Sequence, residues 1–367
     1  MTFSVVFLLA LGVSVGGAGA ENSPDPVGDL HLRASRAALL GSYEEARKYY
    51  LQELDLLIAD GKQVEAAGIY LELGELTQIH GAFPAAESDY KTGLDLLKRY
   101  AQPNDFRLAG AMDDLGWLYI TWGRFLEGSR LMDLARTKAQ EAQQNNPDLI
   151  RHLDMQGAYQ LVAGRYSEAK KDWNRALDIG KMTYGPDSPE YAAVFVHLGQ
   201  ANALYGDYDA ASQMFRRFFE IEDPVSTLPS TSWAMAAGEL AHAYVQLRKF
   251  SEARPWFDQA LSIFKGDQDR APLVHSILLS YLGDYYMAQD SWRNAESEYR
   301  QALDLRRKVL GDNNAVAATM ISLSKALQKL HLKEEAKELL ARAKALLANQ
   351  KSPPMDQTVD VMALRRP

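Results

Sequence analysis

Small and apolar residues recur along this chain at a fixed distance, and the stretch Leu198 to Phe218 (LGQANALYGDYDAASQMFRRF) shows the pattern. A small residue returns every 40 to 42 positions, and a large apolar or aromatic residue follows it four positions later. Because residues i and i+4 share one face of an α-helix, each couple predicts an apolar stripe. Eight couples align: Ala46 and Tyr50, Ala86 and Tyr90, Gly128 and Met132, Ala169 and Trp173, Ala211 and Phe215, Ala253 and Phe257, Ala295 and Tyr299, and Ala336 and Leu340. A regular period of this length is typical of a repeat array.

A second periodic feature predicts a turn inside each repeat. Five positions before the small residue, the chain carries Gly41, Gly81, Gly123, Gly164 and Gly206, and then Arg248, Asp290 and His331. Glycine readily adopts the left-handed backbone conformation that ends many helices. The pattern therefore predicts two helices per repeat joined by a tight turn. We expect the turns without glycine, in the last three repeats, to cost about 1 kcal/mol more each.

One repeat carries the signature of a known family. Leu282-Gly283 is followed by Tyr286, Ala295 and Tyr299, an order that resembles the tetratricopeptide repeat. The usual unit of that family has 34 residues, and the unit here is longer by about eight, which is roughly one more turn on each helix. The long form resembles the repeats of kinesin light chains, with the best matches at 302–319 and 176–190.

The resemblance implies an all-α fold, a right-handed α-solenoid of about eight antiparallel helix pairs over residues 27–349. It also implies that the first helix of each pair lines a concave face. The fourth repeat departs from the family pattern, because Gln156 stands in place of the leucine and Gln160 in place of the aromatic residue.

The ends of the chain differ from the repeats. Residues 1–20 are uncharged, with an apolar core from Val5 to Leu11 and the small residues Ala18-Gly19-Ala20 before Glu21. This arrangement predicts a secretory signal peptide, although no Lys or Arg precedes the apolar core, and a retained membrane anchor is the alternative. We expect an exported protein, periplasmic or secreted, without a stable membrane anchor after cleavage, and a bacterial source fits this style of array.

Three further segments are interpreted as connections. Residues 21–26 are expected to form a linker and 350–367 a disordered tail, since neither shows helical periodicity. The Pro-, Ser- and Thr-rich stretch 223–232 is a candidate break between repeats, and an ordinary long loop between repeats is the alternative.

The composition argues against several classes of function. The formal net charge is -8 and no basic block is present, which disfavours nucleic acid as a partner. The chain has no Cys, so it has no disulfide and no thiolate metal site. Its seven His residues never stand three or four positions apart, which leaves no helical metal pair. We expect no catalytic site, no cofactor and no metal, and therefore no enzyme.

The inward positions that the resemblance implies carry a distinctive set of side chains. They are Glu72, Glu75, Asp113, Asp114, Trp117, Asp154, His197, Gln200, Glu239, His242, Tyr281, Asp284 and, in the last repeat, Lys325. Before Lys325 the set is mostly acidic, with aromatic residues interspersed. Carboxylates beside aromatic rings suit a basic peptide through ion pairs and cation–π contacts. The alternative is a hydrated surface that binds nothing.

Three functions remain open from the sequence. The first is a non-enzymatic exported scaffold that binds a protein or peptide segment in an acidic concave groove and supports complex assembly. The second is a regulatory or sensor subunit of a separately encoded peptidase or kinase system. The third is an intracellular adaptor of the kinesin-light-chain type, which the predicted signal peptide disfavours.

Overall fold

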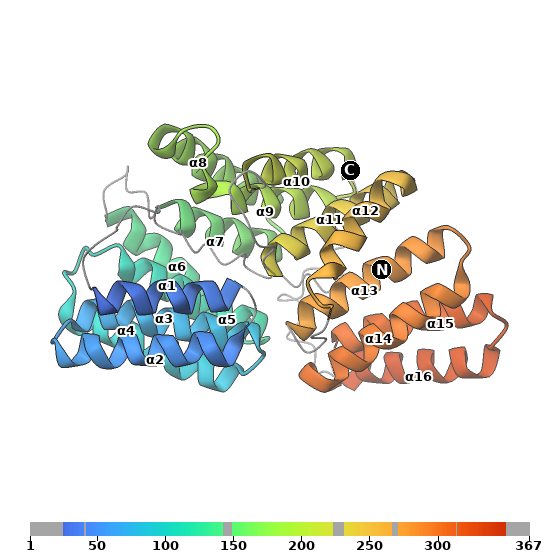
Figure 1. The fold of residues 1–367 in the computed structure, drawn as a ribbon, viewed down its shortest axis with the longest axis horizontal. Helices are drawn as coiled ribbons and strands as arrows, with labels where there is room; N and C mark the ends of the chain where they lie inside the picture. Colours follow the sequence, from blue (N-terminus) through green and yellow to red (C-terminus); the bar gives the residue numbers. More distant parts are fainter. Residues whose placement is uncertain are drawn as a thin grey trace. The chain divides into compact units, whose positions relative to one another are not determined.

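The computed structural model describes residues 25–39, 42–141, 149–222, 231–265, 271–312 and 314–349. Throughout these residues the regular structure is helical and contains no β-strand, which confirms the all-α fold class (Figure 1). The elements are α1 (Pro26–Leu39), α2 (Tyr43–Ala59), α3 (Gln63–Ile79), α4 (Phe83–Tyr100), α5 (Arg107–Thr121), α6 (Phe125–Glu141), α7 (Leu149–Val162), α8 (Tyr166–Tyr184), the 3₁₀ turn η1 (Pro189–Tyr191), α9 (Ala192–Leu204), α10 (Tyr208–Glu222), α11 (Thr231–Gln246), α12 (Phe250–Ser262), α13 (Pro272–Ala288), α14 (Trp292–Leu310), α15 (Asn314–Lys329) and α16 (Lys333–Asn349). The predicted signal peptide, the predicted tail, Gly41 and residues 223–230 of the candidate break lie outside the described residues.

The helices pack in consecutive pairs, one pair per predicted repeat. Contacts join α1 to α2, α3 to α4, α5 to α6, α7 to α8, α11 to α12, α13 to α14 and α15 to α16, and α9 meets α10 where the Phe215 ring lies against Gly199. First helices also contact the first helices of the next pair, as α3 does with α5, α5 with α7 and α11 with α13. The two helices of each repeat therefore bury their apolar stripes against each other and against the neighbouring repeats, as a solenoid requires.

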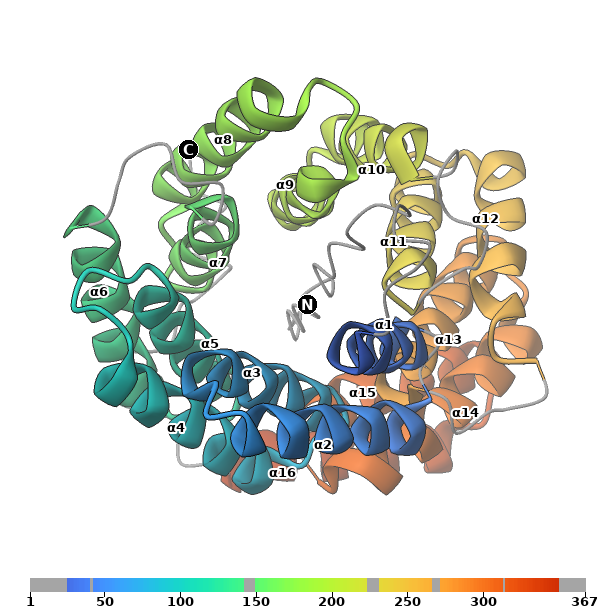
Figure 2. The same ribbon diagram turned by 60° about the vertical axis from the view of Figure 1, so that its left-hand side comes forward.

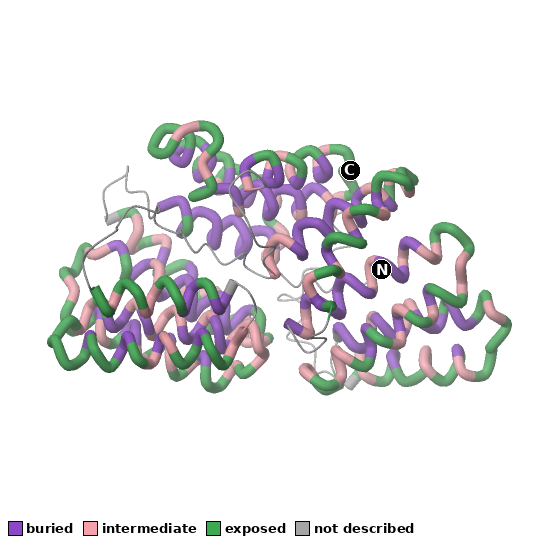
Figure 3. Tube along the Cα trace, in the orientation of Figure 1, coloured by how far each residue is buried: buried purple, intermediate pink, exposed green. Residues whose placement is uncertain are grey.

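The described helices belong to two compact units. The N-terminal unit comprises residues 25–197 together with Ile221 and Glu222, and the C-terminal unit comprises residues 198–220 and 231–349. Within the N-terminal unit, the first helices α1, α3, α5 and α7 form one layer and the second helices α2, α4, α6 and α8 form another (Figure 2). Helices α5 and α7 are buried on nearly all sides, whereas the second helices have one exposed face (Figure 3).

The turn inside each pair has the conformation that the sequence predicts. Positive φ angles are found at Gly81, Gly123, Gly164 and Gly206, and also at Arg248, Asp290 and His331, where φ is 59°, 58° and 63°. In each case the next residue donates a backbone hydrogen bond to the carbonyl five positions earlier, at 2.7 to 3.2 Å. This is the Schellman closure of a helix. The prediction is confirmed, and three residues with a Cβ atom occupy left-handed positions.

Glycine in place of His331 is expected to stabilise the chain. His331 is exposed and has a left-handed backbone. Replacing it with glycine removes the steric cost of its Cβ atom, so the free energy of unfolding should rise by about 1 kcal/mol. Urea unfolding followed by circular dichroism measures this change. His331→Ala is the matched control, because it removes the imidazole but keeps the Cβ atom; an equal gain in both variants would contradict the backbone explanation.

The Leu-Gly signature has a steric basis. A Cβ atom added to Gly74, Gly157 or Gly283 would lie 2.7, 2.6 or 2.5 Å from the ring of Tyr90, Trp173 or Tyr299 respectively, in each case sixteen residues later. These distances are shorter than van der Waals contact. The ring on the second helix therefore occupies the space that a side chain on the first helix would need, and the two helices can pack closely.

Candidate functional site

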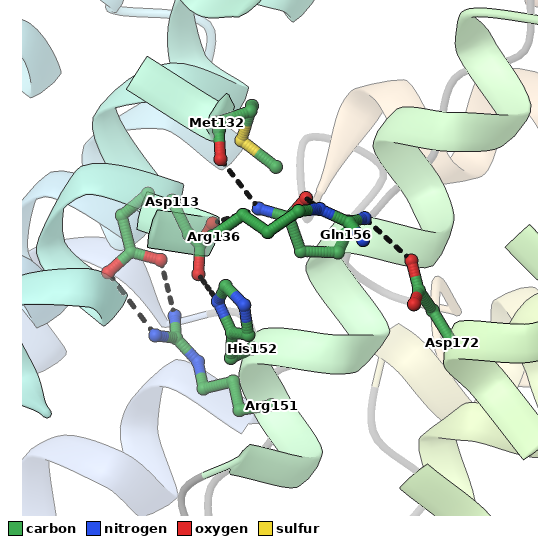
Figure 4. A network of polar contacts seen from close by, with 8 residues as sticks. Asp113, Met132, Arg136, Arg151, His152, Gln156 and Asp172 are labelled. Carbon is green, nitrogen blue, oxygen red and sulfur yellow. Dashed lines mark hydrogen bonds and ion pairs between the residues drawn. The ribbon is translucent and has the colours of Figure 1, made fainter. Parts of the chain in front are cut away.

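The predicted inward positions of the N-terminal unit bring polar side chains from neighbouring first helices together. Asp113 on α5 is fully buried and accepts two hydrogen bonds from α7 (Figure 4). The His152 Nδ1 atom lies 2.6 Å from one carboxylate oxygen, and the Gln156 amide donates to the other at 2.9 Å. Burial raises the pKa of Asp113 above its ordinary value, and the facing His152 opposes this rise.

The same network explains why the fourth repeat lacks the family leucine. The Gln156 amide nitrogen also donates to the Met132 carbonyl oxygen at 3.0 Å, and its amide oxygen accepts from Arg136 at 3.1 Å (Figure 4). Arg136 in turn donates to Asp172 on α8 at 2.8 Å. A leucine at position 156 could make none of these bonds. Gln156 therefore connects α5, α6 and α7 through a satisfied polar network in place of an apolar contact.

A second contact joins α5 to α7 at the neighbouring carboxylate. Arg151 donates two hydrogen bonds to Asp114, at 2.7 and 3.3 Å, and lies 3.9 Å from Glu75 on α3. Burial raises the pKa of Glu75 to about 7, because Arg151 offsets the loss of hydration only in part, while Asp114 and Glu72 add negative charge nearby. One arginine thus faces several carboxylates.

Two further histidine–carboxylate contacts lie at the two ends of this unit. At α7, the Asp154 carboxylate accepts from the Trp173 indole at 2.9 Å and lies 2.6 Å from His197 Nδ1. At α1, His31 Nδ1 lies 3.3 Å from Glu53, and its Nε2 lies 3.9 Å from Glu72. The hydrogen bond with Glu53 raises the pKa of His31.

The predicted positions in the C-terminal unit have a different environment. Glu239 on α11 accepts a hydrogen bond from the Tyr281 hydroxyl on α13 at 3.0 Å. The His242 ring stacks on the Tyr281 ring, with centroids 4.4 Å apart. Asp284 accepts from the Tyr299 hydroxyl at 2.6 Å. Burial raises the pKa of Glu239 to about 7, and hydrogen bonds with Tyr281 and Gln200 lower it in part.

The predicted site residues divide into buried and accessible groups. Asp113, Asp114, Trp117, Asp154, His197, Glu239 and His242 are buried, Glu72, Glu75, Gln200, Tyr281 and Asp284 are intermediate, and Lys325 is exposed. That these residues form a peptide site stays a prediction. The structure does show three contacting residues that the sequence does not predict, His31, Arg151 and His152. His152 stands four positions before Gln156 on the same face of α7, so extending that face by one turn would have included it.

Two further properties of the described residues concern metal ions and the lipid bilayer. Nowhere among them do three His, Asp or Glu side chains come together in a way that could hold a metal ion. In the same part of the chain, none of the helices combines the length and the apolarity that crossing a bilayer requires.

Known proteins share both the repeats and the fold. Residues 152–221 and 274–349 match one model of the tetratricopeptide repeat family, and residues 233–265 match a second model of that family. Together with the helix pairs and their turns, these matches show that the chain is a tetratricopeptide repeat protein. Its repeats are of the kinesin-light-chain-like type.

Protein KINESIN LIGHT CHAIN-RELATED 2 of Arabidopsis thaliana is 24% identical over 299 residues, which cover 78% of this chain and 44% of that protein.

Two solved structures share the fold at low sequence identity. The Rap conjugation gene regulator of the plasmid pLS20, in complex with the Phr peptide, matches 88% of this chain and 95% of its own, with a TM-score of 0.60 and 15% identity. The apo form of the quorum sensor NprR from B. thuringiensis matches 88% of this chain and 99% of its own, with a TM-score of 0.56 and 13% identity. These likenesses concern the fold alone.

Proposed function

We propose that this chain is a non-enzymatic, exported scaffold that binds a basic protein or peptide segment along its first helices and thereby supports assembly of a complex. Tetratricopeptide repeats are suited to this task, because stacked first helices present a long continuous surface. Export is proposed from the sequence of residues 1–20.

The charge of the first-helix face carries the proposal. Carboxylates occupy inward positions in five of the six repeats from Glu72 to Asp284, and they outnumber the cations that contact them. Glu72 and Asp284 keep 36% and 40% of their side-chain surface exposed. Accessible carboxylates whose negative charge is only partly balanced by nearby cations favour a positively charged partner and raise its rate of association.

Likeness to peptide-binding proteins gives further support. The Rap regulator was solved with a peptide bound, and its fold extends over most of this chain. Extended segments also suit a surface of this kind, because one segment can contact several repeats in turn. The partner that we propose is accordingly a Lys- or Arg-containing segment of another protein.

Loss of the two accessible carboxylates should weaken capture of the partner. The double variant Glu72→Gln with Asp284→Asn keeps side-chain size and removes two negative charges. Affinity for the natural partner, captured from the native host and identified by mass spectrometry, should fall roughly fivefold, about 1 kcal/mol, since partly exposed ion pairs contribute on this scale. Added salt should weaken capture by the wild-type chain in the same direction.

A matched control distinguishes an effect of these two positions from an effect of the lower negative charge of the whole chain. Asp55 and Asp304 are exposed on the second helices α2 and α14, so Asp55→Asn with Asp304→Asn removes the same charge elsewhere. The control should retain wild-type affinity. Equal affinity in all three proteins, or a captured partner whose binding segment is acidic, would contradict the proposal. Asp113 and Asp114 are unsuitable for this test, because their buried contacts also stabilise the fold.

A second candidate function is a sensor subunit that regulates a separately encoded peptidase or kinase. The observation that favours it is the likeness to NprR, which is described as a quorum sensor. A regulated enzyme among the captured partners, with an activity that changes on adding the pure chain, would favour this function over a passive scaffold. The intracellular adaptor function is favoured only by the plant relative, and localisation of the mature chain by fractionation and N-terminal sequencing tests it.

A further inference from the structure

The buried carboxylates of the two units differ in the side chains that contact them. In the N-terminal unit, Asp113, Asp114 and Asp154 contact His152, Arg151 and His197 at 2.6 to 2.7 Å. In the C-terminal unit, Glu239 is only 9% exposed, yet its hydrogen-bond partners are the uncharged Tyr281 and Gln200. A buried carboxylate that lacks a cation is unfavourable, because burial removes its hydration and neutral donors replace it only in part.

A second observation concerns unpaired polar atoms beside Glu239. His242 is 6% exposed, and its Nδ1 atom has no hydrogen-bond partner among the described residues. The amide oxygen of Gln200 is buried and unpaired in the same way. A buried polar atom without a partner is unfavourable, because burial removes its hydration and nothing replaces it. Both atoms belong to the first helices α9 and α11, as Glu239 does.

The unpaired Gln200 oxygen is a hydrogen-bond acceptor by its chemistry. Burial lowers the pKa of His242, so its ring is uncharged at neutral pH. The Gln246 amide nitrogen lies 3.3 Å from His242 Nε2, and the Asp284 carboxylate lies 3.9 Å from His242 Nδ1. The Glu239 carboxylate and the Gln200 oxygen are therefore acceptors that lack a positively charged donor.

The charges around this cluster do not supply that donor. Asp284 on α13 lies 3.9 Å from His242 and adds a second negative charge. Tyr281 is uncharged, because burial raises its pKa well above the ordinary value. Arg306 on α14 faces Asp284 and Tyr281, but its guanidinium donates to Ser276, Thr319 and the Ala315 carbonyl, and no ion pair within 4 Å joins it to Asp284 in the part of the chain that the structure describes.

We propose that Gln200, Glu239, His242, Tyr281 and Asp284 form a receptor for one alkylammonium or guanidinium side chain of the partner segment. Asp284, at the more exposed end, meets the cation first, and Glu239, at the buried end, accepts its hydrogen bonds together with the Gln200 oxygen. A cation carries several donors and a positive charge, so it can pair with the Gln200 oxygen and with the Glu239 carboxylate at once. This inference rests on the proposed function and assigns the cation subsite to the C-terminal unit.

The protonation of Glu239 provides a readout of the receptor. Its pKa is raised to about 7 from an ordinary value of 4.5, so the folded chain binds more protons than the unfolded chain between these pH values. Stability from this group is present at acid pH and is lost as pH rises toward 7. A bound cation favours the charged carboxylate, so the cation should bind more tightly at pH 8 than at pH 6.

Calorimetry with a minimal probe tests the receptor in the full chain. The probe is the capped tripeptide acetyl-Gly-Lys-Gly-amide, and the neutral control replaces its lysine with norleucine. We expect saturable binding of the lysine peptide in the millimolar range, no binding of the norleucine peptide, and tighter binding at pH 8. Glu239→Gln should weaken binding at least tenfold and abolish its pH dependence, because it removes the buried charge. Asp304→Asn, which removes an exposed carboxylate of α14, should bind like wild type.

Several results would overturn the inference. They are equal binding of the lysine and norleucine peptides, no saturable binding at tens of millimolar, or unchanged affinity in Glu239→Gln. Tight binding of n-pentylammonium without binding of the capped peptide would indicate a receptor for free amines and would also overturn it. Asp284→Asn, with an expected smaller loss, is the second variant, and circular dichroism checks that every variant is folded. The probe test needs no natural partner, so its failure beside successful capture from the host would leave the proposed function standing.

Discussion

Replacing Trp173 with alanine is expected to lower the free energy of unfolding by about 3–5 kcal/mol. The Trp173 side chain is 0% exposed and lies against Gly157, which has no side chain to fill the space that would be left. Its indole also donates to the Asp154 carboxylate at 2.9 Å, a bond that alanine cannot make. Urea unfolding followed by circular dichroism and by tryptophan fluorescence measures the loss.

Two matched variants separate packing from hydrogen bonding at this position. Trp173→Phe keeps most of the ring volume and loses only the indole donor, so we expect a loss of about 1–3 kcal/mol. Met182→Ala truncates a large residue of the same helix that is 78% exposed, and it should change stability by less than about 0.5 kcal/mol. A loss in Trp173→Ala no greater than that in Met182→Ala would contradict the packing of α7 on α8.

Replacing Asp113 with alanine is expected to cost about 2–6 kcal/mol, because it leaves two buried polar groups without their hydrogen-bond partner, at about 1–3 kcal/mol each. The change leaves His152 Nδ1 and one of the Gln156 amide protons without their acceptor in the interior between α5 and α7. Urea unfolding of Asp113→Ala, His152→Ala and the double variant gives the coupling energy of the pair. We expect the double variant to lose clearly less than the sum of the single losses.

The control for this pair is a carboxylate of the same unit that faces solvent. Asp133 on α6 is exposed, and Asp133→Ala removes the same charge. It should change stability by no more than about 0.5 kcal/mol. Strictly additive losses at Asp113 and His152 would show that the contact contributes nothing, and the account of the α5–α7 network would then be wrong.

The repeat pattern predicts much of the fold and little of the site. The helix pairs, their turns at Gly123 or Arg248, and the steric demand of the Leu-Gly signature all follow from residues close together along the chain. The departure at Gln156 is visible in the sequence, but its partners are not, since Asp113 stands 43 residues earlier. Position within a repeat indicates which side chains point inward, and it gives no measure of how far each is buried.

The sequence by itself determined that the chain is an all-α array of helix pairs, with a left-handed residue ending the first helix of each described pair after the first. These features depend on local rules: spacing of four along a helix, steric freedom at positive φ, and a small residue opposite a large one. Only the tertiary structure decided which carboxylates are paired. Arg151 reaches Asp114 and Glu75 because first helices from successive repeats lie side by side, whereas Glu239 meets only neutral partners. Such contacts depend on side chains some forty residues apart, and the repeat period does not encode them.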